Sequence, residues 1–597
     1  MALVRKWEAS RHGAAMHIDC LRLQRFRSCA DVKVRFHREL TVLVGENNGG
    51  KSNIVDALRL LTLPLNGRRD RYPEDEDLRR GSTETHYALE GQFAGLGDTM
   101  KGLLISAVPD PTADLAVFGM RYQTRTPGTL RGRASSWAGR FDTAEPESGS
   151  TDLIRHVYLP PLRDAKQALG TGSATRITAL LQHFLQTGEE EGFLTHVQRT
   201  GDPHRVLTAI NTDIASALGD LTRGARPQTA SLAFTAEALA DVARDLRFRL
   251  ADLGLPPEDI KSSGLGYANL LYMATVVVEL AKAREADLTL FLVEEPEAHL
   301  HPQLQMLVLD FLLAQAQKSA ARETAPGQPE GRIQVIVTTH SPNLTAWVSP
   351  EHLVVVRSAQ DSGTTPPTMK TVSIPVSGLG LDPRMIQKVS RYLDVTRSAL
   401  LFGNRALLVE GIAEALLMPV IARHCIFNTD PHALQRFRGA VVVAIDGVDF
   451  APYVHILLHP CEGATIADRV VVITDADPHS PGNRKADLEA RATEWGVADR
   501  LNVLTNAVTL EHELYSAGNG ALLREVFLLL HPQSAQRWTS DVDGVAAADR
   551  PAAFVQLLKA TSTRKGDFAQ QLAERIVAGS AFTVPNYLRD AIIAVAE

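Results

Sequence analysis

One short stretch restricts the possible folds of this chain more than any other. Residues 41–53 read TVLVGENNGGKSN, in which an apolar run enters the pattern Gly-x4-Gly-Lys-Ser, and the helical sequence SNIVDALRLL follows. Strand, glycine-rich turn and helix in this order are the setting of a P-loop, because glycines let backbone N–H groups close around phosphate. A fortuitous glycine turn is the alternative, and the presence of all three elements argues against it.

The P-loop assigns roles to individual side chains. We expect Lys51 to reach the β- and γ-phosphates of ATP and Ser52 to offer its hydroxyl to Mg²⁺. The loop residues predicted to bind the nucleotide are Asn47, Asn48, Gly50, Lys51, Ser52 and Asn53.

Two further apolar runs end in residues suited to nucleotide hydrolysis. Residues 288–303, LTLFLVEEPEAHLHPQ, end a strand in Glu294 and Glu295, a costly arrangement unless the acids face a cation or catalyse. Glu294 suits Mg²⁺, and Glu295 suits a general base that polarises water. In IQVIVTTHSPNL, His340 ends another strand and would sense the γ-phosphate. An exposed acidic strand end and a structural histidine are the alternatives.

These motifs resemble the ABC-type ATPase heads of the SMC, RecF and OLD group, and LRLQRFRSC near the start resembles the opening strand of that group. The resemblance implies that Glu294 holds the Walker B metal, that Glu295 is catalytic and that His340 is the switch. It makes His299 and His301 structural residues of a D-loop. It also implies a signature loop facing a partner's ATP, for which SSGLGYANLLYMATVVVELA offers Gly264 and Gly266, with Ser263 or Gly264 in the position of the family serine.

A second acidic pattern lies in the C-terminal half. In ALLVEGIAEAL, Glu410 ends a strand and Glu414 lies on the first turn of the next helix, and VVVITDADP ends another strand in Asp475 and Asp477. Because ligands bind at the carboxyl edge of such sheets, we expect these acids to gather there and to raise one another's pKa values. Oxygen-rich clusters favour Mg²⁺ or Mn²⁺ over zinc. A solvated acidic turn would explain either piece alone.

This second pattern resembles the Toprim domain. A topoisomerase would need a tyrosine nucleophile and a larger gate, and a Toprim primase a zinc module. A P-loop head followed by Toprim resembles the overcoming-lysogenization-defect (OLD) nucleases from about Met16 onward. The resemblance adds Glu511 of TLEHELY, rather than Glu513, to the predicted metal ligands. It also implies that Lys565 assists the metal site. His479 is interpreted as a loop residue. Glu410 and Glu414 would build one metal position with one aspartate, and Asp475, Asp477 and Glu511 the other.

Composition sets outer limits. The chain has 597 residues, a net charge of −7 and four scattered cysteines without CxxC spacing, so two or three domains are expected and a zinc ribbon or a disulfide framework is not. No apolar run reaches the length of a membrane span.

The fold class is α/β, an ABC-type P-loop ATPase head with a helical insertion, followed by a Toprim α/β domain with C-terminal helices. The predicted segments are 1–15 (N-terminal extension), 16–164 (first ATPase segment), 165–250 (helical insertion, dimerisation), 251–380 (second ATPase segment), 381–403 (linker), 404–515 (Toprim nuclease core) and 516–597 (C-terminal helices).

The function expected from this combination is an ATP-regulated DNA endonuclease with two-metal catalysis, in prokaryotic anti-phage defence or DNA processing. We expect ATP and Mg²⁺ as cofactors, with Mn²⁺ or Ca²⁺ as other occupants of the Toprim site. The expected partners are DNA, a second copy in a homodimer or higher even oligomer, and a helicase or other defence protein, with no membrane and a cytoplasmic location. Two alternatives remain: an ATP-dependent DNA-binding or repair protein without nuclease activity, and an ATPase that serves a protein partner.

Overall fold

The structure is a computed structural model that divides into two compact units, Met1–Ser377 and Gly378–Glu597. It describes residues 15–65, 67, 69–125, 131–142, 144–161, 184, 204–222, 228–233, 247–252, 256–260, 263–322, 328–361, 367–392, 395–476 and 483–597.

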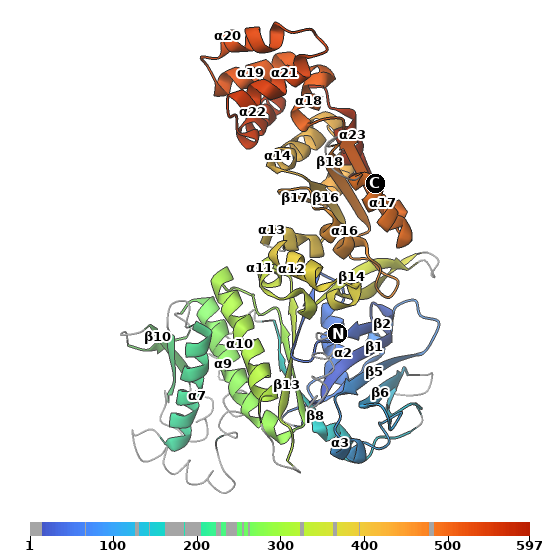
Figure 1. Ribbon diagram of the computed structural model, residues 1–597. Coiled ribbons are helices and arrows are strands. Elements are labelled where there is room, and N and C mark those ends of the chain that lie inside the picture. Colours follow the sequence, from blue (N-terminus) through green and yellow to red (C-terminus); the bar gives the residue numbers. More distant parts are fainter. Residues whose placement is uncertain are drawn as a thin grey trace. The chain divides into compact units, whose positions relative to one another are not determined.

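A seven-stranded sheet forms the centre of the first unit (Figure 1). Its middle strands are almost continuously apolar, as parallel strands covered on both faces are. In pairing order the strands are β15 (Thr368–Pro375), β14 (Leu353–Asp361), β3 (Leu40–Val44), β13 (Arg332–Thr339), β12 (Leu288–Glu294), β8 (Ile154–Leu159) and β4 (Leu63–Pro64).

The register of this sheet brings the predicted ATPase motifs together. Strands β3, β13, β12 and β8 run parallel, so their carboxyl ends share one edge. Val44 pairs with Thr339, and Glu294 pairs with Thr338. The P-loop, the paired glutamates and His340 therefore leave the sheet side by side, although they are far apart in the chain.

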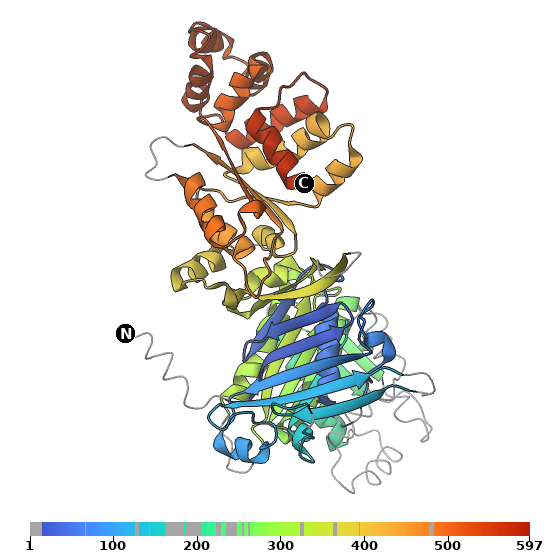
Figure 2. The same cartoon turned by 90° about the vertical axis from the view of Figure 1, so that its right-hand side faces the viewer.

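An antiparallel five-stranded sheet faces the viewer in Figure 2. Helix α2 (Lys51–Leu61) packs against its strands β1 and β5 and buries Ile54, Val55 and Leu58 completely. One apolar core therefore joins the P-loop helix to both sheets. The strands are β2 (Cys29–Arg35), β1 (His17–Phe26), β5 (His86–Ala94), β6 (Leu115–Gln123) and β7 (Arg133–Ala138).

The other helices of the first unit include α10, which packs along β13, and α7, which packs against α9 (Figure 1). Their bounds are α3 (Asp98–Leu103), α7 (Arg205–Thr222), α9 (Leu265–Glu279), α10 (Pro302–Ala320) and α11 (Pro342–Trp347).

The segment 165–250, predicted to be helical, contains two described stretches that are strands. Arg247–Asp252 form strand β10, which pairs with β9 (Gln228–Ala233) and β11 (Glu258–Asp259). Phe248 and Leu250 are buried while Arg249 between them is exposed, and this period of two fits a strand. Most of 165–204 lies outside the described residues.

The second unit contains a four-stranded parallel sheet. In pairing order its strands are β17 (Val441–Ala444), β16 (Arg405–Val409), β18 (Arg469–Asp475) and β19 (Leu501–Asn506). Val409 pairs with Ala444, and Asp475 pairs with Asn506, so all four strands end at one edge.

Helices surround this sheet and continue to the end of the chain. Helix α14 packs against α22, and α23 packs against β18 and β19, which together form a single apolar core. The helices are α12 (Pro383–Tyr392), α13 (Val395–Ser398), α14 (Ile412–Ile421), α15 (Pro431–Arg438), α16 (Ala451–Leu458), α17 (Arg484–Glu494), α18 (Leu510–Leu514), α19 (Gly520–Leu530), α20 (Ala535–Trp538), α21 (Arg550–Ala560), α22 (Lys565–Val577) and α23 (Asn586–Ala596). No helix among the described residues combines the length and hydropathy that a membrane span requires.

Candidate functional sites

The P-loop lysine is held in place by its own loop. Lys51 is 5% exposed, and its Nζ donates to the carbonyl oxygens of Gly45 at 2.7 Å and Glu46 at 2.9 Å. Burial lowers its pKa to about 8. Gly50 has φ +108°, and a Cβ there would lie 2.3 Å from the Thr371 hydroxyl, so this position requires glycine.

His340 connects Lys51 to Glu295. Lys51 Nζ lies 3.2 Å from His340 Nδ1, and His340 Nε2 lies 3.4 Å from Glu295 Oε1. An ammonium can only donate, so Nδ1 is the acceptor and the imidazole proton is on Nε2, facing the carboxylate. Burial and the charge of Lys51 lower the pKa of His340, which keeps the ring neutral.

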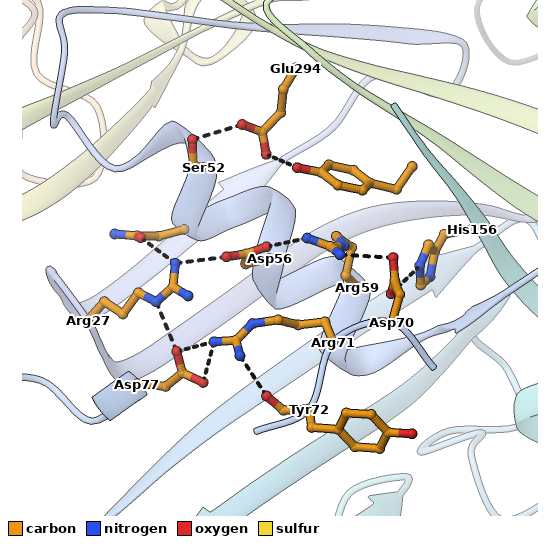
Figure 3. Close-up of polar contacts among 12 residues, drawn as sticks. Arg27, Ser52, Asp56, Arg59, Asp70, Arg71, Tyr72, Asp77, His156 and Glu294 are labelled. Atoms are coloured by element: carbon orange, nitrogen blue, oxygen red, sulfur yellow. Dashed lines mark hydrogen bonds and ion pairs between the residues drawn. The ribbon is translucent and has the colours of Figure 1, made fainter. Parts of the chain in front are cut away.

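Glu294 is held by a hydroxyl on each side. Ser52 Oγ donates to Oε2 at 3.0 Å (Figure 3). Tyr158 OH donates to Oε1 at 3.3 Å. Burial raises the pKa of Glu294. A hydroxyl and a carboxylate at the phosphate loop are a donor pair that fits Mg²⁺, so the residues present match the implied metal.

Glu297, which was not predicted from the sequence, joins the D-loop to the switch. Its Oε1 accepts from Thr339 Oγ1 at 2.7 Å and from the backbone N–H of His340 at 2.8 Å. The only sequence signal was a third acid in EEPEAH.

A cavity of about 720 Å³ lies beside the P-loop and His340, and the predicted acids Glu294 and Glu295 do not line it. It is lined by Asn48, Gly50, Lys51, Ser52, Asn53 and His340 among others, whereas the exposed Asn47 does not line it.

The signature segment lies apart from this cavity. Gly264 is the N-cap of α9, and Gly266 packs on the D-loop, where a Cβ would lie 2.9 Å from the His299 carbonyl oxygen. Asn269 donates to the Ala298 carbonyl at 2.7 Å. Ser263 donates to Ile260 within its own turn. Neither Gly264 nor Gly266 lines the Lys51 cavity of its own chain.

In the second unit, three donors fix one oxygen of Glu410. Its Oε1 accepts from Thr474 Oγ1 at 2.5 Å, the backbone N–H of Asp475 at 2.8 Å and Arg484 Nη1 at 3.1 Å. Arg484 also donates to Thr474 Oγ1. Neither Thr474 nor Arg484 was predicted from the sequence.

The pKa values of the neighbouring acids are raised, mainly by burial and to a smaller extent by one another. Burial, with contributions from Asp475 and Glu511, raises the pKa of Glu414 to about 7. Burial and Glu410 raise the pKa of Asp475 to about 6, although Asn506 donates to this carboxylate. Asp477 and His479 lie outside the residues whose surroundings the structure describes.

Glu511 and Glu513 have different surroundings. Glu511 is buried, and its Oε1 lies 3.0 Å from Lys565 Nζ at the start of α22. Glu513 accepts from the backbone N–H of Ala507 at 3.3 Å, within its own turn.

A cavity of about 380 Å³ lies over this edge of the sheet. It is lined by Glu410, Glu414, Asp475 and Lys565, and also by Asp446, another strand-end acid that was not predicted from the sequence. Among the described residues, no three acidic, histidine or cysteine side chains already form a metal cage. The donor chemistry nevertheless fits a hard divalent cation, because the half-buried carboxylates of Glu410, Glu414 and Asp475 face one space.

Comparison with known proteins identifies the two halves. The family model "AAA ATPase domain" matches residues 16–93 and 252–345, and "Overcoming lysogenization defect protein-like, TOPRIM domain" matches residues 401–477. The chain therefore carries an AAA-type ATPase domain and an OLD-like Toprim domain.

Two relatives extend the similarity over most of the chain. The Old nuclease of Escherichia phage P2 is 23% identical over 458 residues, which cover 71% of this chain and 72% of the relative. The OLD nuclease of Thermus scotoductus is 24% identical over 497 residues, covering 79% and 84%. A crystal structure titled SmcHead bound to the C-winged helix domain of ScpA covers 60% of this chain and 98% of its own, at 19% identity and a TM-score of 0.40.

The predicted fold class is confirmed, as is the expectation of an enzyme that joins an ATPase to a nuclease-type Toprim domain. Such domains use a nucleotide and a divalent metal ion. The individual site residues remain predictions that the geometry above supports.

Proposed function

We propose that this chain is a DNA endonuclease whose phosphodiester cleavage at the Toprim site is regulated by its ATPase. The observation that carries this proposal is the cavity that Glu410, Glu414, Asp475 and Lys565 share. The names of the OLD relatives support a nuclease, and therefore a DNA substrate.

The ATPase residues are arranged for hydrolysis of ATP. Lys51 would turn from the loop carbonyls to the phosphates, and Ser52 and Glu294 would hold Mg²⁺. Glu295 would accept the proton of the attacking water, while neutral His340 donates from Nε2 and orients that carboxylate.

The Toprim residues are arranged for a crowded anionic transition state. Divalent cations held by these carboxylates would supply an activated water and would neutralise the leaving 3′ oxygen. Because Oε1 of Glu410 accepts three hydrogen bonds, we assign its Oε2 to the cation. Glu410 and Glu414 would serve one metal position with one aspartate, and Asp475, Asp477 and Glu511 the other. Lys565 would add positive charge beside the phosphate.

We further propose Mg²⁺ as the physiological ion, with Mn²⁺ or Ca²⁺ able to replace it in the Toprim site. A homodimer or higher even oligomer belongs to the proposal, because Gly264 and Gly266 do not line the cavity of their own chain and a second copy would have to supply them. The segment 165–250 is proposed as the dimerisation element. The proposed setting is the prokaryotic cytoplasm, in anti-phage defence or DNA processing with a helicase or another defence protein.

A plasmid-nicking assay with Mg²⁺ or Mn²⁺ tests the proposal. Wild type should cut, and Asp475→Ala should lose activity by roughly a hundredfold or more, as expected when a catalytic charge partner is removed. Asp499→Ala, at an exposed acid of the same unit, is the matched control. No cleavage by wild type with either ion would favour the DNA-binding alternative, and equal cleavage by Asp475→Ala would refute the site.

A further inference from the structure

Tyr158 stands beside the Walker B carboxylate but belongs to none of the nucleotide motifs. It lies on β8, opposite Leu292 of β12 in the parallel register, two positions before Glu294. Its hydroxyl donates to Glu294 Oε1 at 3.3 Å, while Ser52 donates to Oε2 at 3.0 Å. Each oxygen of Glu294 therefore has one hydroxyl donor.

The two donors differ in what happens when metal binds. If the Ser52 hydroxyl turns to Mg²⁺, its hydrogen bond to Glu294 is given up. The Tyr158 hydroxyl contacts the other carboxylate oxygen and is not expected to bind the metal. It then remains to fix the orientation of Glu294.

The ring of Tyr158 is itself held by the P-loop helix. The Arg59 guanidinium lies 3.8 Å from the centroid of the Tyr158 ring, a cation–π contact. Ser52 and Arg59 are both on α2, about two turns apart, so both reach the same side of the helix. One helix therefore acts on Glu294 directly through Ser52 and indirectly through Arg59 and Tyr158.

Arg59 is prevented from moving away by carboxylates on two sides. Its Nη1 lies 2.9 Å from Asp56 Oδ1, and its Nη2 lies 2.9 Å from Asp70 Oδ2 (Figure 3). Asp56 also pairs with Arg27 at 2.9 Å, and Asp70 faces the buried His156. These pairs fix the guanidinium under the ring.

We propose that Tyr158 is a positioning residue that holds Glu294 in the orientation needed to bind nucleotide-associated Mg²⁺. The inference rests on the proposed ATPase site. It predicts that the Tyr158 hydroxyl affects metal affinity, and that the ring contact with Arg59 supports this effect.

Mg²⁺ titration of nucleotide binding by the full chain tests this inference. A fluorescent ATP analogue is the probe, at fixed concentration and with Mg²⁺ varied from an EDTA baseline. Tyr158→Phe keeps the ring over Arg59 and removes only the hydroxyl. It should raise the half-saturating Mg²⁺ concentration by roughly three- to tenfold, the range of one lost hydrogen bond. Nucleotide affinity in EDTA should not change.

Two variants complete the design. Tyr158→Leu also removes the ring and should shift the Mg²⁺ midpoint further than Tyr158→Phe. Tyr122→Phe removes a hydroxyl that donates to Asp75 at 3.1 Å elsewhere in the same unit, and it should match wild type. A melting curve of each variant in EDTA reports whether it is folded.

The outcomes separate the inference from the proposed function. An unchanged Mg²⁺ midpoint in Tyr158→Phe, with normal binding by wild type, would overturn the positioning role alone. Equal weakening in EDTA and in Mg²⁺ would overturn it too, because the residue would then act through the fold of the cavity. If wild type bound no nucleotide under any condition, the ATPase proposal would fail and the inference with it.

Discussion

The two candidate sites use parallel strand ends in the same way but differ in how their charges are balanced. At the ATPase site, Lys51, His340 and Glu295 form a chain of contacts, and both oxygens of Glu294 have a hydroxyl donor. At the Toprim site, Glu414 and Asp475 are half-buried acids with raised pKa values. The ion pairs at this edge are made by their neighbours, Arg484 with Glu410 and Lys565 with Glu511.

The two sites therefore differ in how much they depend on a bound cation for charge balance. The ATPase site is balanced by its own side chains, and it must exchange those contacts for phosphate and metal. The Toprim site has excess negative charge. A bound cation would therefore reduce the electrostatic repulsion between its carboxylates. Metal should therefore stabilise the second unit more than it stabilises the first.

The largest expected effect is at the ATPase site. Lys51→Ala removes the cation of the P-loop and should reduce ATP turnover by roughly a hundredfold or more. Metal binding at the Toprim site should be unchanged, because the acids there do not depend on Lys51. Steady-state ATPase assays and Mn²⁺ titration measure the two properties, with the exposed Lys33→Ala as control. Wild-type turnover by Lys51→Ala would refute the P-loop assignment.

The next largest effect is expected at Arg484, the arginine that pairs with Glu410. Arg484→Gln removes a charge-assisted hydrogen bond between two mostly buried groups and should destabilise the metal-free protein by about 1–2 kcal/mol. Bound metal would replace this charge, so the rise in melting temperature on adding Mn²⁺ should be larger than in wild type.

The neighbouring residue provides a matched control for Arg484. Lys485→Gln removes the same charge from the same turn of α17, but Lys485 pairs with Glu489, at 3.8 Å, on its own helix. It should behave like wild type. If both variants responded equally to Mn²⁺, general charge rather than contact with Glu410 would be responsible.

The smallest effect is a dependence of stability on pH. The pKa of Glu414 is about 7 in the folded protein and near 4.5 when unfolded, so its ionisation costs stability. This cost begins above pH 4.5 and is complete above pH 7. In EDTA at pH 8, Glu414→Gln should therefore raise the melting temperature by roughly 2–4 °C, the equivalent of about 1 kcal/mol.

The gain from Glu414→Gln should disappear near pH 4.5, where wild-type Glu414 is protonated. Melting curves in EDTA across this range measure it. A gain of the same size at both pH values would contradict the ionisation argument, and saturating Mn²⁺ should favour wild type at pH 8.

Contiguous motifs account for what could be predicted from the sequence. Apolar runs that end in GENNGGKS, EEPE and TTH define strand ends, and the parallel sheet brings strand ends together. The same rule placed Glu410 and Asp475 at one edge. Applied to VVVAID, it would also have selected Asp446.

The partners of these residues could not be predicted in this way. Tyr158 is one aromatic residue in an apolar strand, and its contact with Glu294, 136 positions away in the chain, depends on β8 pairing with β12. Arg484 opens a helix as many surface arginines do, and only the fold places it on Glu410. Contacts that depend on non-consecutive pairing leave no local pattern.

The separation of these contacts along the chain has a consequence for synthesis on the ribosome. Ser52 and Glu294 are 242 positions apart, whereas Thr474 and Glu410 are 64 positions apart. A growing chain would expose its P-loop for a long interval before β12 and β13 were made, because loop closure must precede such long-range pairing. The acidic edge of the second unit would instead close soon after its strands emerge. We therefore expect nascent chains of the first unit to depend on chaperones more than those of the second.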